Sequence, residues 1–295
     1  MVTPTFKFAV LLKPSDAQPA LDRAAQYARV NKDIEVVAIR VVNEFKEADI
    51  DQIRIKENSN FEALKRSYAS IENFSFKVIF SKEVATAFTD ECRNGNYNIA
   101  IISANKRHTL RDMFISNIDS SIMRNSSIPV LVVRTATATA QLGQSVVLAI
   151  DFHEVAHLDK LDDYLFDAAS RFAKSFDGQV HLANCVTPQN SGLMGGNLDQ
   201  SKIVAGGAIN PIGLHLKLAD EFAKKHNIEE KNIHVIQGRI DEEIPRLCEQ
   251  LNARMVCMGT TPRSTFLGSL NSSAGELVLE QIKGDVFIVN SNGIL

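Results

Sequence analysis

The sequence predicts two tandem α/β domains, each an open, mostly parallel five-stranded sheet with helices on both faces. Two observations support this fold class. First, the chain repeats itself, because the apolar segments 98–103 and 129–133 reappear 156 residues later at 254–259 and 285–289. Second, buried-strand patterns alternate with helical patterns in each copy, an order that requires a parallel sheet covered by helices. A repeat of this length indicates two copies of one domain rather than a solenoid.

The repeat is recognised by its constant register, because the sequence identity between the two copies is low. The offset of 156 holds without a gap from about Val78/His234 to Val133/Val289. Identical pairs on it include Cys92/Cys248, Asn96/Asn252, Arg107/Arg263, Thr109/Thr265, Ser116/Ser272 and Val130/Val286. The first strands are offset by 138, so the second copy carries 18 extra residues, mostly within 187–211. This glycine-containing stretch is interpreted either as a loop beside a ligand cleft or as a tolerated surface insertion.

Hydrophobic periodicity gives the order of the elements. In the first copy, strands are expected at 8–12, 34–42, 74–80, 99–102 and 130–133, with helices at 17–30, 61–70, 84–92 and 117–123. In the second copy, strands are expected at 146–150, 180–186, 233–236, 255–258 and 286–289, with helices at 158–176, 212–226, 240–251 and 274–282. The stretch 135–144 has low complexity and no core-forming period. The predicted domains are therefore 1–134 and 145–295, with 135–144 as a linker.

Composition indicates which partners and which cellular location to expect. A formal net charge of -3 on 295 residues disfavours nucleic acid as a partner. No apolar run reaches the roughly 20 residues that cross a bilayer, and the first residues lack a signal-peptide pattern, so we expect a cytoplasmic protein without membrane contact. The four cysteines are far apart or lie in apolar segments, without CxxC spacing, and are expected to be reduced core residues.

The segment from His153 to His157 spells His-Glu-Val-Ala-His, which matches the HExxH pattern of zinc hydrolases. Zinc chemistry needs both histidines well inside a stable helix, together with a third ligand. Here the motif follows a buried strand after only two residues, at the turn before a helix. We therefore predict no metal at His153 and His157, and polar residues at the start of an amphipathic helix explain the pattern.

The segment 256–263, continuing through 272–278 to 286–289, resembles the C-terminal signature of the universal stress protein family. In that family a strand ends in a glycine, the loop runs Gly-x2-Gly-x9-Gly-Ser/Thr, and a helix and a final strand follow. Asp151, at the end of the first strand of the second copy, matches the family's aspartate. The tandem arrangement resembles the E-type (UspE-like) branch, in which one chain carries two such Rossmann-like domains, and the resemblance covers essentially the whole chain.

The resemblance implies a nucleotide site in the second copy. In family members that bind ATP, the aspartate lies near the adenine and the glycine loop holds the phosphates, because glycines let backbone N–H groups approach them. The implied cofactor is ATP, and the implied binding residues are Asp151, Gly259, Thr260, Arg263, Ser272 and Ser273. The match is partial, since Pro262 replaces the second glycine and has no N–H.

The first copy departs further from the family pattern. Lys13 stands at the position of the aspartate, and Ser103, Lys106, Ser116 and Asn117 stand at the positions of the loop. A lysine removes the expected acceptor for the base, so the first copy is predicted to have lost its site.

Two hypotheses about function follow. The preferred one is a non-enzymatic stress-response protein whose second domain binds a nucleotide or another, more apolar, small ligand. The alternative is a weak ATP hydrolase or phosphate-handling enzyme on the same fold. No catalytic residue and no metal are predicted. The final strands, 130–133 and 286–289, are short and apolar, and unprotected sheet edges of that kind invite pairing. In the family that the chain resembles, such strands pair across a two-fold axis, so the resemblance implies that here they pair within one chain as an internal pseudo-dimer, and a further homodimer is left open.

Overall fold

The computed structural model describes residues 6–104, 117–134, 142, 144–152, 159–186, 211–260 and 281–290. The predicted helix 274–282 lies almost entirely outside these residues. The elements of the first copy are β1 (Phe6–Leu11), α1 (Pro19–Val30), β2 (Ile34–Val42), α2 (Ile50–Ser67), β3 (Asn73–Phe80), α3 (Val84–Asn94), β4 (Ile99–Ser103), α4 (Asn117–Asn125) and β5 (Val130–Val133). Those of the second are β6 (Ser145–Ala149), α5 (Asp159–Lys174), β7 (Gln179–Val186), α6 (Pro211–His226), β8 (Ile233–Gln237), α7 (Ile240–Gln250), β9 (Met255–Thr260) and β10 (Asp285–Asn290).

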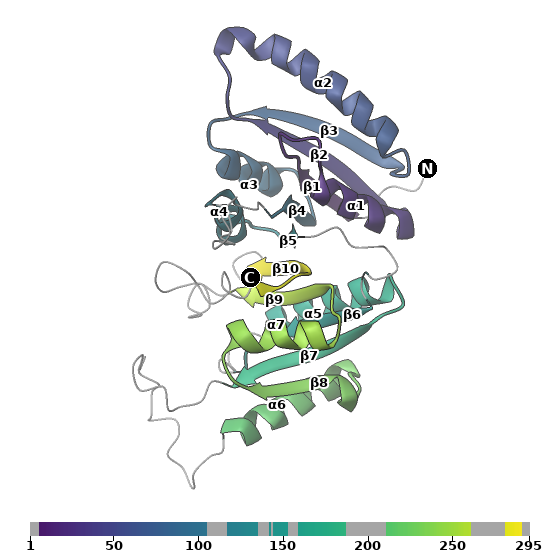
Figure 1. Ribbon diagram of the computed structural model, residues 1–295, viewed down its shortest axis with the longest axis vertical. Coiled ribbons are helices and arrows are strands. Elements are labelled where there is room, and N and C mark those ends of the chain that lie inside the picture. Colours follow the sequence, from purple (N-terminus) through teal and green to yellow (C-terminus); the bar gives the residue numbers. More distant parts are fainter. Residues whose placement is uncertain are drawn as a thin grey trace.

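The ten strands form one sheet in the order β3-β2-β1-β4-β5-β10-β9-β6-β7-β8 (Figure 1). Within each copy the paired strands are parallel. The two copies meet where β5 and β10 pair antiparallel, with Leu131 opposite Phe287. The predicted pairing of the final strands within one chain is therefore confirmed, and it fuses the two five-stranded sheets edge to edge.

Helices cover both faces of this sheet, as predicted, and the core on each face runs through both copies. One face packs residues of α1, α5 and α6, and the other packs residues of α3, α4 and α7. Leu131 and Phe287 belong to the first cluster, whereas Val132 and Val286 belong to the second. On each face the hydrophobic core therefore continues across the junction between the copies.

Helix α2 differs most from its prediction, since it begins at Ile50 rather than near residue 61. None of its residues is buried, and Ile55 is 70% exposed. The helix lies along the edge strand β3 (Figure 1), where the ring of Phe61 stacks on Phe76 with centroids 4.7 Å apart. A helix held by a few edge contacts carries a weak apolar period, so its first turns leave no clear signal in the sequence.

Two of the identical pairs of the repeat, Asn96/Asn252 and Cys92/Cys248, have structural causes. Asn96 and Asn252 follow α3 and α7 at the same distance, and both adopt the left-handed backbone conformation, with φ of 53° and 49°. Asparagine tolerates this conformation better than most residues and ends a helix there. Cys92 and Cys248 are buried on these helices, and all four cysteines are free and buried, which confirms their predicted place in the core.

A buried ion pair crosses the junction between the copies. Arg23 of α1 is 1% exposed and Asp285 of β10 is fully buried. Arg23 Nε lies 2.6 Å from Asp285 Oδ2 without hydrogen-bond alignment, while Nη2 donates to Oδ1 at 3.3 Å. The backbone N–H of Arg134 also donates to Oδ1, at 3.4 Å. Burial raises the pKa of Asp285 to about 6, because desolvation outweighs the attraction of Arg23.

Residues 1–140 expressed alone are expected to self-associate. Removing the second copy exposes the apolar strand β5, whose backbone groups lose the antiparallel partner β10. Size-exclusion chromatography with light scattering would show dimers, larger species or poor solubility. A well-behaved monomer of this fragment would contradict the expectation, and the intact chain at the same concentration is the control.

Arg23→Met is expected to lower the free energy of unfolding by about 3–5 kcal/mol at pH 8, because it leaves the Asp285 carboxylate buried without its partner. The folded pKa of Asp285, about 6, lies above its ordinary 3.8, so the folded state holds the extra proton. The binding of this proton stabilises the folded state fully below about pH 4, and that stabilisation is lost as the pH rises through about 6. Urea unfolding should therefore show a smaller loss at pH 5 than at pH 8.

The double variant Arg23→Met with Asp285→Leu is the matched control. It removes both charges and should recover most of the lost stability, since a buried pair can be replaced by apolar groups at little cost. An equal loss at both pH values, or no recovery in the double variant, would contradict the assignment of the effect to this pair.

Candidate functional site

The candidate site lies at the carboxyl ends of the strands of the second copy. Its strand order reverses between β6 and β9, which are paired with Ala149 opposite Met258. Ligands of open α/β sheets bind at such a switch point, in the crevice beyond the carboxyl ends. Asp151 follows β6 and is exposed, and Gly259 lies at the end of β9. The structure thus brings these two predicted residues to neighbouring strand ends.

The rest of the predicted set is only partly described. Thr260 is the last residue of β9. Arg263, Ser272 and Ser273 lie outside the described residues, as do Pro262 and the first-copy positions Lys106 and Ser116. Their roles toward a phosphate stay predictions.

A buried polar network supports the backbone next to Asp151. Asn184 of β7 is 1% exposed, and its Nδ2 donates to the carbonyl of Ile150 at 2.8 Å. His215 of α6 is 4% exposed, with Nδ1 2.8 Å from Asn184 Oδ1. Because that oxygen only accepts, His215 Nδ1 is assigned as the donor. The network fixes the strand end that presents Asp151 and ties α6 to it.

Sequence reasoning missed Asn184 and His215. The one available signal was a polar residue inside the apolar strand Leu182-Ala183-Asn184-Cys185-Val186, since a buried amide must find partners. Nothing in the spacing of the histidines points to His215, because α6 reaches β7 only through the tertiary fold.

Gly259 has a packing role of its own. A Cβ at this position would lie 2.8 Å from Leu161 Cδ2 and 3.2 Å from Leu165 Cδ1, both on α5. A side chain at residue 259 would therefore require the buried side chains of Leu161 and Leu165 to move. The glycine is explained by helix packing, whether or not its backbone also contacts a ligand.

In the first copy, the side chains at the carboxyl ends of β1 and β4 make hydrogen bonds within the protein. Lys13 follows β1 at the distance at which Asp151 follows β6, and its Nζ donates to the carbonyl of Ala104 at 3.2 Å. Ser103, at the position of Gly259, accepts from the N–H of Ala20 through its Oγ at 2.9 Å. Burial lowers the pKa of Lys13, an effect opposed by Asp119. The Lys13 bond joins the ends of β1 and β4 across the switch point, and the Ser103 bond joins β4 to the start of α1.

Two further histidine contacts were also missed by sequence reasoning. His181 Nδ1 lies 3.2 Å from His234 Nε2, across β7 and β8, and burial lowers the pKa of both rings. His226 Nε2 lies 2.8 Å from Asp163 Oδ1. Within the described part of the chain, no group of three or more His, Cys, Asp or Glu residues could hold a metal ion. His153 and His157 lie outside it.

The fold and the site geometry define a tandem α/β protein of a known class. The Universal stress protein family matches residues 8–134 and 144–290, and the chain belongs to this family. No described helix is long and apolar enough to cross a membrane.

The chain is similar to curated proteins of the E type. It is 24% identical over 208 residues to the Universal stress protein E homolog of Haemophilus influenzae, covering 70% of this chain and 66% of that protein, slightly under two thirds of its length. It is 24% identical over 216 residues to Universal stress protein E of Escherichia coli, covering 72% and 67%.

Solved structures share the tandem fold. A functionally unknown protein from Pseudomonas aeruginosa superposes with a TM-score of 0.74 at 17% identity, covering 98% of this chain and 93% of that one. A universal stress protein from Archaeoglobus fulgidus gives a TM-score of 0.67 at 15% identity, covering 96% of each chain. At these identities the likeness is one of fold.

Gly259→Ala is expected to lower the free energy of unfolding by about 1–3 kcal/mol through overpacking against Leu161. The same change should cost less when it is made in a Leu161→Ala variant, because the atom that the new Cβ meets is absent there. Chemical denaturation of the wild type, the two single variants and the double variant measures this difference. An unchanged stability of Gly259→Ala would rule out the packing role.

Proposed function

We propose that this chain is a non-enzymatic, ligand-binding protein of the stress response, whose second copy binds ATP or another nucleotide while the first copy serves as scaffold. One difference between the copies carries the proposal. Lys13 of the first copy is bonded to the carbonyl of Ala104 across the switch point. Asp151, at the matching position of the second copy, is exposed. An exposed carboxylate at a switch point suits recognition of a ligand donor group.

In this proposal Asp151 accepts a hydrogen bond from an amino group of the base. The backbone beyond β9, with Thr260, Arg263, Ser272 and Ser273, binds the phosphates. Backbone N–H groups and hydroxyls suit phosphate oxygens, and an arginine adds charge. Pro262 offers no N–H, so the affinity is weaker than that of a family member with the full glycine loop.

The polar residues beneath Asp151 favour binding over catalysis. Hydrolysis requires a base within reach of an attacking water. His215 is buried and its Nδ1 is engaged with Asn184, so this ring acts as a support for the strand end. His215 therefore does not supply the base that the alternative function, a weak ATP hydrolase, would require. The four free, buried cysteines agree with the reducing conditions of the cytoplasm, where we place the protein.

Calorimetric titration with ATP should show weaker binding to Asp151→Ala than to the wild type, by roughly 1.5–3 kcal/mol for one charge-assisted hydrogen bond. Lys13→Ala is the matched control, since it alters the same position of the other copy, and its affinity should equal that of the wild type.

Loss of binding only in Lys13→Ala would reverse the assignment of the two copies. Absence of ATP binding in all three proteins would reject the nucleotide and leave a more apolar ligand as the candidate. Release of phosphate from ATP by the wild type, above the rate of a Gly259 variant, would favour the hydrolase instead.

A further inference from the structure

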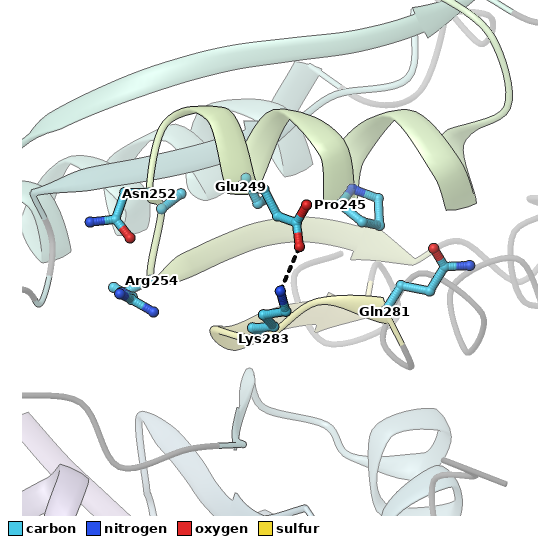
Figure 2. Close-up of a pocket in the computed structure, with 8 residues that line it drawn as sticks. Pro245, Glu249, Asn252, Arg254, Gln281 and Lys283 are labelled. Carbon is cyan, nitrogen blue, oxygen red and sulfur yellow. Dashed lines mark hydrogen bonds and ion pairs between the residues drawn. The ribbon is translucent and has the colours of Figure 1, made fainter. Parts of the chain in front are cut away.

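A second hollow of the second copy lies at the opposite end of the strands from Asp151. It has a volume of about 410 Å³, within the range of small-molecule sites. It is formed where α7 ends and where β9 and β10 begin. Figure 2 shows Asn252 and Arg254 on one side and Gln281 on the other, with Glu249 and Lys283 between them.

Arg254 brings a positive charge to this pocket without a counterion in the described structure. Its Nε is buried and makes no hydrogen bond, and no described side chain pairs with its guanidinium. Lys283, by contrast, contacts Glu249 at 2.7 Å (Figure 2). A buried donor without an acceptor is unfavourable, and a guanidinium is suited to bind a carboxylate or phosphate with two parallel hydrogen bonds.

The first copy uses the same positions for its fold. Tyr97 stands where the second copy has Ala253, and its ring lies against Gly95 while its hydroxyl donates to Glu91 at 2.9 Å. Asn98 stands where the second copy has Arg254, and its Oδ1 accepts from the N–H of Lys7 at 2.7 Å. In the second copy the aromatic ring is absent and the amide is replaced by a cation.

We propose that this pocket binds a small organic anion, with its carboxylate or phosphate group on Arg254 and its apolar part on Pro245 and Ala253. The side-chain amides of Asn252 and Gln281 add donors at the rim. Lys283 adds positive potential, which its pairing with Glu249 partly offsets. The pocket is separate from the nucleotide site, because it lies at the amino ends of β9 and β10 whereas Asp151 lies at a carboxyl end.

Titration of the intact protein with hexyl phosphate, hexanoate and inorganic phosphate tests the proposal. Saturable binding of hexyl phosphate or hexanoate at one site is expected, and whichever binds more tightly defines the anionic group. Arg254→Asn should weaken that binding at least tenfold, and Ala253→Tyr should abolish it. Both variants install the residue that stands at the same position of the first copy.

Two variants serve as controls. Lys217→Met removes one exposed positive charge on α6 outside the pocket, and Asp151→Ala alters the nucleotide site, so both should bind like the wild type. The proposal is overturned if neither organic anion binds the wild type, or if Arg254→Asn and Ala253→Tyr bind as tightly as it does. Binding of inorganic phosphate as tight as that of hexyl phosphate would overturn the role of Pro245 and Ala253.

Discussion

The antiparallel pairing of β5 with β10 is the constraint on which the rest of the structure depends. These strands are short and apolar on both faces, so neither could be left as a free edge in water. Their pairing makes one sheet of two, and it carries both hydrophobic clusters from one copy into the other. It also buries Asp285 at the junction, where Arg23 provides the compensating charge. The two copies are thereby held as one unit.

Once the copies share a core, they are free to diverge away from the junction. In the first copy, polar side chains at both ends of the sheet bond to the backbone: Lys13 to Ala104 at one end, and Asn98 to Lys7 at the other. In the second copy the matching residues are Asp151 and Arg254, which are charged groups at an exposed strand end and in a pocket. In a fused pair each of the two proposed sites is needed in only one copy, since the other copy contributes stability through the shared sheet.

The fold could be predicted closely because its signals are local and repeated. Strands β4, β5, β9 and β10 are mainly apolar, and the shared register places β4 and β5 on β9 and β10. Helix α2 could be placed only in part, since it packs on an edge and buries none of its residues. For the site, Asp151 and Gly259 could be chosen from a motif, but the Asn184–His215 contact could not, since its partners are 31 residues apart on different elements.

The sequence by itself determined the duplication, the alternation of strands and helices, the burial of the cysteines and the family, because each depends on residue type and spacing along the chain. The tertiary structure alone decided which distant side chains meet. It brought Arg23 against Asp285, joined Lys13 to the carbonyl of Ala104, and packed Leu161 and Leu165 of α5 against Gly259. These outcomes depend on how closely packed elements approach one another, and spacing along a chain does not encode that distance.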